Sequence, residues 1–197
     1  MFMYASLAVV CLACLLCLYQ PFIELWVGPS LMLPDYIVWL LGGYFYVRIL
    51  GDIRSVYVDA AGLWWKLKGR SIIEAVLNII LNCILVQVLG LPGVIIATIV
   101  SMLLINYLWG SEVVFTHYFQ NGGLKTFFGD NLIYVITTVL CCVVPYVLLS
   151  LIPVSPLGKL IAGAALAITL SAGLWILLFS RSKRLRAAFD FLKFLKA

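Results

Sequence analysis

Three polar side chains recur at intervals of four in the otherwise apolar stretch EAVLNIILN (74–82), namely Glu74, Asn78 and Asn82. An α-helix has 3.6 residues per turn, so each step of four drifts by only about 40° and the three side chains share one face. A carboxylate and two amides can form hydrogen bonds with a hydrophilic substrate or orient neighbouring charged side chains. Glu74 is the candidate for coupling to an ion, and Asn78 and Asn82 are candidates for binding a substrate.

A second set of charged side chains lies in the segment 42–59, which reads GGYFYVRILGDIRSVYVD. Arg48 precedes Asp52 by four residues, a spacing that predicts an ion pair on one helix face. Arg54 follows half a turn later. A guanidinium is always charged and matches the geometry of phosphate oxygens, so Arg48 and Arg54 are candidates for binding an anionic substrate. Asp52 would hold Arg48 in place.

A structural interpretation of the same residues stays open. Arg54 and Asp59 could lie among lipid headgroups, and the two asparagines could simply hydrogen-bond a neighbouring helix. Such contacts within membranes contribute about 0.6 kcal/mol on average. The alternative is that the polar stripe lines a water-filled path, which is where charged side chains inside membrane segments are usually found.

The composition indicates the setting of these residues. Of 197 residues, 65% are hydrophobic and 11% are charged, whereas soluble domains have about 25% charged residues. The mean hydropathy is +1.16. Apolar runs long enough to cross a bilayer recur along the chain, and the short alternating segments of a membrane β-barrel do not. We therefore expect an all-α integral membrane protein.

We expect six membrane-spanning helices within residues 1–180, separated by Gln20-Pro21, the basic stretch ending at Arg70, and three Gly- or Pro-rich turns. The predicted spans are 3–19, 35–57, 71–89, 92–110, 131–152 and 157–180. Two of them carry small residues every four positions, which predicts close helix packing. These ridges are Gly93, Ala97, Ser101 and Gly163, Ala167, Ser171.

Lysine and arginine are distributed unevenly between the two predicted sides of the membrane. With the N-terminus in the cytoplasm, twelve of them fall in cytoplasmic segments and Lys159 alone falls outside. Positive residues near span ends are retained in the cytoplasm, so both termini are predicted to be cytoplasmic. The net charge of +5 then reflects topology, and no nucleic-acid partner is expected.

The last seventeen residues, 181–197, combine a basic face with Phe189, Leu192 and Leu195. This pattern is typical of an amphipathic helix lying on anionic lipid. We therefore expect a cytoplasmic tail that contacts membrane lipid.

Neither an enzyme nor a metal site is indicated. His117 is the only histidine, which argues against a Ser/His/Asp triad or a histidine metal centre. Cys11, Cys14 and Cys17 have metal-like spacing, but a zinc ion needs a fourth ligand and polar surroundings that this apolar segment lacks. We expect no catalytic residue, metal or cofactor.

Two stretches of the sequence resemble polysaccharide flippases. These are PFIELWVG (21–28) and the segment 59–119. The matching features of the longer segment are its AAGL helix end, a basic turn, the glutamate and asparagines on the next helix, and the turn GLPGV followed by ATIVS. The resembling family belongs to the multidrug/oligosaccharidyl-lipid/polysaccharide exporter superfamily. The resemblance extends over residues 1–120, whereas the last two predicted spans match only in hydropathy.

The resemblance implies one lobe of a two-lobed transporter of the bacterial inner membrane, equivalent to the C-terminal lobe. Its cargo would be an undecaprenyl-pyrophosphate-linked oligosaccharide. Arg48 and Arg54 would then attract the pyrophosphate, and Asn78 and Asn82 would contact sugar. A missing N-terminal lobe or a partner chain would be needed for transport. A lobe of a multidrug exporter and a non-transporting membrane scaffold remain the alternatives.

Overall fold

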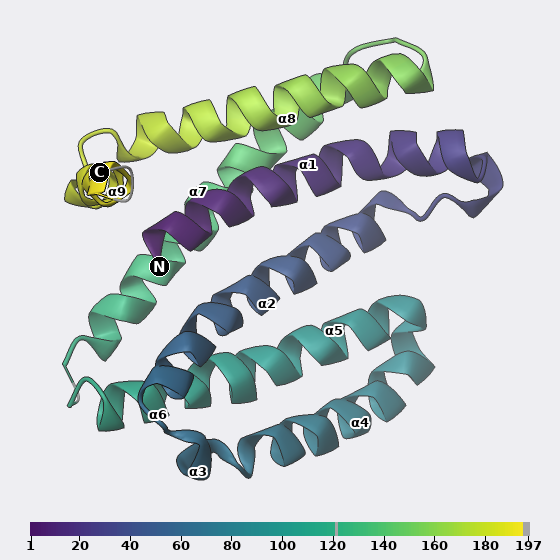
Figure 1. Ribbon diagram of the computed structural model, residues 1–197. Coiled ribbons are helices and arrows are strands. Elements are labelled where there is room, and N and C mark those ends of the chain that lie inside the picture. Colours follow the sequence, from purple (N-terminus) through teal and green to yellow (C-terminus); the bar gives the residue numbers. More distant parts are fainter. Residues whose placement is uncertain (121, 195–197) are drawn as a thin grey trace. The chain divides into compact units, whose positions relative to one another are not determined.

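The computed structural model describes residues 1–120 and 122–194, without the side chains of 189 and 191–194. Every regular element in this part of the chain is helical (Figure 1). The chain forms two compact units. Unit 1 combines Met1–Pro34 with the segment from Leu132 onward, and unit 2 is Asp35–Asn131.

Six helical segments of the described chain are long and apolar enough to cross a membrane, which confirms the expected number of spans. Four of these segments contain a single helix, α1 (Phe2–Trp26), α2 (Asp35–Ala60), α7 (Leu124–Ser150) and α8 (Pro156–Phe179). The third consists of α3 (Trp64–Leu67) and α4 (Arg70–Leu89). The fourth runs through α5 (Leu91–Ser101), the π-helix η2 (Met102–Trp109) and α6 (Gly110–His117).

Several predicted span ends differ from the structure. The third and fifth segments begin at Trp64 and Leu124, ahead of the predicted starts at 71 and 131. Two further differences have an identifiable physical reason. Gln20-Pro21 does not end the first helix, because Pro21 lies buried inside α1, which continues to Trp26. A proline is tolerated in membrane helices, since neighbouring groups satisfy the backbone acceptor it leaves free. The fourth segment extends beyond residue 110 to His117, because Val114 packs with Val58 and Leu67 in a small buried cluster.

Unit 1 is held together by close packing of α1 against α8. Gly163, Ala167 and Ser171 are all buried, as the predicted small-residue ridge requires. A Cβ atom added at Gly163 would lie 3.0 Å from Leu149 Cδ2 and 3.5 Å from the backbone oxygen of Cys17. The small residue therefore sets the helix separation. At the other end of these helices an aromatic cluster forms, with Phe2, Tyr134, Trp175 and Phe179.

Unit 2 contains the second small-residue ridge. Gly93, Ala97 and Ser101 are buried on α5, and a Cβ at Gly93 would collide with the backbone carbonyl of Leu85 on α4. The two helices are joined by Gly90, whose φ of +64° lies in the left-handed region that favours glycine. The result is a tight antiparallel hairpin in which no residue of α4 is fully buried.

The last described element is a further helix, α9 (Lys183–Phe194), which lies within the predicted helical tail 181–197. The apolar residues expected to anchor it fall outside the described part. Neither the side chains of Phe189 and Leu192 nor any part of Leu195 is described.

Candidate functional site

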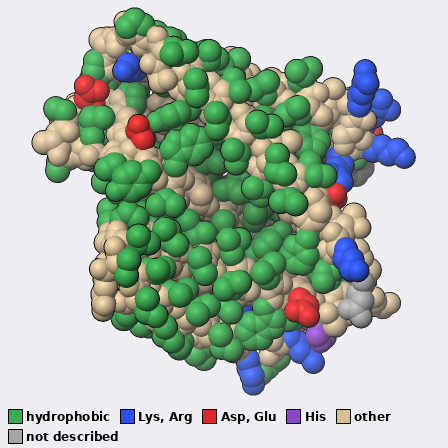
Figure 2. All heavy atoms as spheres, turned by 180° about the vertical axis from the view of Figure 1, so that it is seen from behind, with side chains coloured by type: hydrophobic (Ala, Val, Ile, Leu, Met, Phe, Trp, Pro, Cys, Tyr) green, Lys and Arg blue, Asp and Glu red, His purple; other side chains and the backbone are tan. Residues whose placement is uncertain are grey.

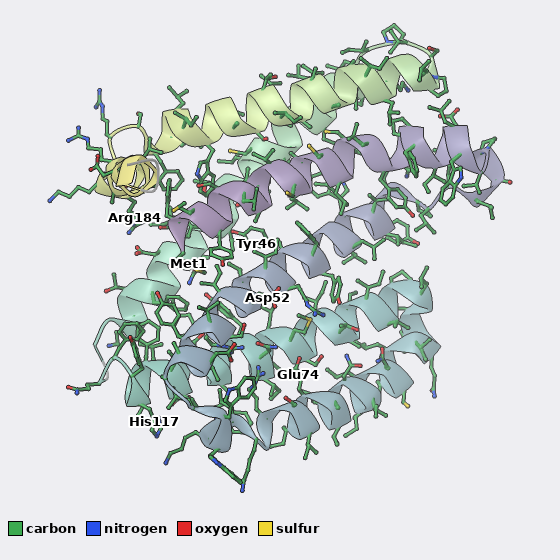
Figure 3. All side chains as sticks on the ribbon, viewed as in Figure 1. Met1, Tyr46, Asp52, Glu74, His117 and Arg184 are labelled. Carbon is green, nitrogen blue, oxygen red and sulfur yellow. The ribbon has the colours of Figure 1, made fainter. Side chains whose placement is uncertain are left out.

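Unit 2 contains a cavity of about 460 Å³ lined by α2, α4, α5 and η2. Its charged lining residues come from two helices, Arg48 and Asp52 from α2 and Arg70 and Glu74 from α4. Figure 3 labels Asp52 on α2 and Glu74 on α4. Two guanidinium groups and two carboxylates thus share one hollow among segments that are otherwise apolar. We refer to this hollow as the polar cavity.

The ion pair observed in the polar cavity differs from the predicted one. Arg70 Nη1 lies 3.8 Å from Glu74 Oε2, again at a spacing of four residues. Arg48 and Asp52 both line the cavity and are exposed, but within the described chain no ion pair joins them. The charge of Glu74 is therefore offset by Arg70. The guanidinium of Arg48 is available to solvent.

Amide groups connect the two helices of the hairpin. Asn78 Nδ2 donates to Ser101 Oγ at 3.0 Å and to Thr98 Oγ1 at 3.3 Å, which ties α4 to α5. Asn82 Nδ2 donates to Asn78 Oδ1 at 2.8 Å. This bond confirms that Asn78 and Asn82 share one face of α4. Asn78 lines the polar cavity together with Glu74, whereas Asn82 is not among the lining residues.

Arg54 lies behind the cavity wall instead of in it. Its side chain is only 6% exposed, and it does not line the polar cavity. Its Nη2 donates to Asn106 Oδ1, and Asn106 does line the cavity. Nε and Nη1 have no hydrogen-bond partner within the described protein. Arg54 therefore acts on the cavity through Asn106 in this structure.

The close fit of Arg54 depends on two glycines. A Cβ added at Gly110 would collide with the Arg54 guanidinium, and one added at Gly51 would lie 3.1 Å from Asn106 Oδ1. Asn106 itself belongs to η2. π-Helical turns are rare and occur frequently at functional sites, because they change which side chains face a neighbouring helix. Here the π-helix presents Met102 and Asn106 to the polar cavity.

Sequence reasoning missed Arg70 and Asn106 as parts of this site. For Arg70 a signal was present, since Arg70 and Glu74 have the same spacing as Arg48 and Asp52. For Asn106 the signal was a single amide inside the apolar run LLINYL, where a polar side chain is costly unless it has a partner. Neither pattern identifies that partner without the tertiary structure.

The described residues contain no cluster of three or more histidine, cysteine or acidic side chains that could hold a metal ion. Comparison of the chain with protein-family models, with curated proteins and with solved structures gave no match.

Proposed function

We propose that this protein is a lobe of a membrane transporter, equivalent to the C-terminal lobe of a polysaccharide flippase. In this proposal the polar cavity receives the pyrophosphate and first sugars of an undecaprenyl-pyrophosphate-linked oligosaccharide in the bacterial inner membrane. A further lobe or partner chain completes the transport path. The supporting observation is the cavity itself, which brings four charged side chains together within helices of membrane-spanning length.

The charges of the cavity fit an anionic, hydroxyl-rich cargo. Arg48 is exposed and free of an ion pair within the described chain, so its guanidinium can pair with phosphate oxygens. Arg70 already contacts Glu74 at 3.8 Å, and a proton or cation taken up by Glu74 would release Arg70 toward the same phosphate. Asn106 lines the cavity and accepts from Arg54 through Oδ1, which leaves its Nδ2 for a sugar hydroxyl. A multidrug exporter lobe, with an apolar cavity for its cargo, is supported less well by this lining.

A membrane scaffold is the second candidate, and one specific observation favours it. Asn78 uses its donors on Thr98 and Ser101, so the amide already has a purely structural role between α4 and α5. In a scaffold the polar residues would only join helices, and the space between them would exclude water. The two candidates therefore differ in whether water reaches the face of α4 that carries Glu74 and Asn78.

Labelling with a membrane-impermeant maleimide distinguishes the transporter from the scaffold. The six native cysteines are replaced by alanine, and single cysteines are introduced as Arg48→Cys, Glu74→Cys and Asn78→Cys. Ile79→Cys is the matched control, because Ile79 is exposed on the apolar outer face of α4 and would face lipid. A transporter gives rapid labelling at 48, 74 and 78 and none at 79. Equal protection at all four positions would refute the water-filled cavity.

Cargo class is tested by binding to the purified protein in detergent. The probe is a pyrophosphate-linked disaccharide on a polyprenyl chain, compared with a cationic dye. Arg48→Ala is expected to weaken binding of the pyrophosphate probe about ten- to hundredfold, since a charge-assisted bidentate contact contributes on the order of 1.5–3 kcal/mol. Lys159→Ala, at the start of α8 in unit 1, is the control and should leave binding unchanged. Preference for the dye would favour the drug-exporter alternative.

A further inference from the structure

Unit 1 contains a second cavity, of about 270 Å³, where the beginning of α1, the end of α8 and α9 meet. We call it the α9 groove. Its lining is apolar apart from Ser6, and the lining residues include Phe2, Val10, Ala172, Trp175 and Leu185. The Ser6 hydroxyl already accepts from Trp175 Nε1 at 2.8 Å and donates to the Phe2 carbonyl at 2.9 Å. No free polar group of the lining is left for a hydrophilic ligand.

The groove starts at the helix ends and runs inward along the helices. Its lining on α1 extends from Phe2 to Val10, a length of about 12 Å at 1.5 Å per residue. On α8 it extends from Ala172 to Ile176, and the helix ends at Phe179. An acyl chain anchored by a headgroup at the membrane surface would enter along this direction.

Basic side chains surround the same end of unit 1. Arg181, Lys183 and Arg186 are exposed, and Leu185, which lies between the last two, lines the groove. Arg184 lies over the ring of Tyr134, with Cζ 5.5 Å from its centroid. Figure 2 shows Lys and Arg side chains gathered at the end of unit 1 where α9 lies.

Leu185 and Ala188 line the groove from α9, and their neighbours four residues earlier are Arg181 and Arg184. Residues four apart lie on the same side of a helix, so these two arginines are the basic side chains nearest the groove. An apolar groove flanked by basic side chains is complementary to a molecule with an apolar chain and an anionic head.

We propose that the α9 groove binds one acyl chain of an anionic phospholipid, whose phosphate is held by Arg181 and Arg184. The lipid fixes α9 against α1 and α8. This inference does not depend on the transport function. It also differs from general attraction of a basic helix to an anionic membrane, because it requires the groove as well as the charge.

Native mass spectrometry of the protein released from detergent micelles tests the proposal, since no membrane surface is then present. The probes are phosphatidylglycerol and phosphatidylcholine with identical acyl chains, offered at equal concentration. We expect one phosphatidylglycerol retained per chain and at least tenfold less phosphatidylcholine. Equal retention of the two lipids would overturn the proposal.

Two variants separate the groove from its charged rim. Arg181→Gln together with Arg184→Gln removes two positive charges and should lower phosphatidylglycerol retention about 30-fold, given the contribution of about 1 kcal/mol of each basic residue to binding anionic lipid. Ala172→Phe fills the groove without changing charge and should lower retention of both lipids. Ala165→Phe is its matched control, because Ala165 is exposed on the same helix. Wild-type retention by either the double charge variant or Ala172→Phe would overturn the proposal.

Discussion

The guanidinium of Arg54 donates from Nη2 to Oδ1 of Asn106, which joins α2 to the π-helix η2. Arg54 is only 6% exposed. Its other two guanidinium nitrogens, Nε and Nη1, have no hydrogen-bond partner within the described protein. A buried charge depends strongly on the partners it retains. The position of Asn106 at the cavity wall is therefore coupled to the position of Arg54.

Substitution of Asn106 tests this coupling. Asn106→Leu removes the acceptor and should lower the free energy of unfolding by about 1.5–3 kcal/mol, the usual contribution of a hydrogen bond to a charged group. Asn106→Asp keeps an acceptor oxygen and adds a negative charge, so it should be at least as stable as the wild type. Unfolding followed by circular dichroism in detergent measures both. Equal stability of Asn106→Leu and Asn106→Asp would show that the bond contributes nothing.

Gly110 is expected to be required by Arg54 specifically. Gly110→Ala places a methyl group against the guanidinium and should lower the free energy of unfolding by about 1–3 kcal/mol, as overpacking does. Gly129→Ala is the control, because nothing lies within 4 Å of that position in α7, and it should stabilise its helix by up to about 1 kcal/mol.

A double variant tests whether Arg54 is the group that a methyl group at position 110 would contact. If Arg54 is the group that the added methyl would contact, Arg54→Leu should remove most of the effect of Gly110→Ala. A double-mutant cycle measures this, with an interaction energy within about 0.5–3 kcal/mol. Additive effects of the two substitutions would place the clash elsewhere.

The α4–α5 hairpin should be sensitive to one methyl group at Gly93. Gly93→Ala brings Cβ into the backbone carbonyl of Leu85, which cannot rotate away, so the helices must separate and Asn78 should lose its bonds to Thr98 and Ser101. We expect a loss of about 1–3 kcal/mol. Gly43→Ala on α2 is the control, since its Cβ would meet Ile99 Cδ1 at an ordinary 3.8 Å. Thermal unfolding of the two variants in the same detergent measures the difference.

The bond between Trp175 and Ser6 joins α8 to α1 near the α9 groove. Trp175→Phe and Ser6→Ala each remove one side of it, and each should cost about 1 kcal/mol or more. In a double-mutant cycle their effects should be less than additive by about 0.5–1.5 kcal/mol. Strict additivity would mean that the bond is absent in solution.

Much of the fold could be predicted from local patterns. Hydropathy identified six spans, and spacing of four identified both small-residue ridges and the shared face of Asn78 and Asn82. These features depend only on residues within one helix. The continuation of α1 through Pro21 was not predicted. A proline lacks the backbone N–H that a helix needs, so the sequence pattern indicates a helix end, whereas neighbouring helices in the folded protein can make the proline tolerable.

The candidate site was predicted less completely. The spacing of Arg48 and Asp52 permits an ion pair, but the same spacing also permits Arg70 and Glu74 to pair, and the latter is observed. Arg54 was expected to contact cargo, yet it bonds to Asn106 behind the wall. The choice among such partners is made by contacts between helices and by the π-helical turn of η2, and neither is encoded in the periodicity of one segment.

The division of the chain into units has a consequence for biosynthesis. Unit 2 is continuous in sequence, so its helices can assemble as they leave the ribosome. Helix α1 packs mainly on α8, whose first residue is Pro156. At about 5–20 residues per second, translation takes on the order of ten seconds to cover that interval. During this time α1 lacks its main neighbour, and the side chains that α8 later covers, among them Val9, Leu12 and Leu16, are without their final packing partners.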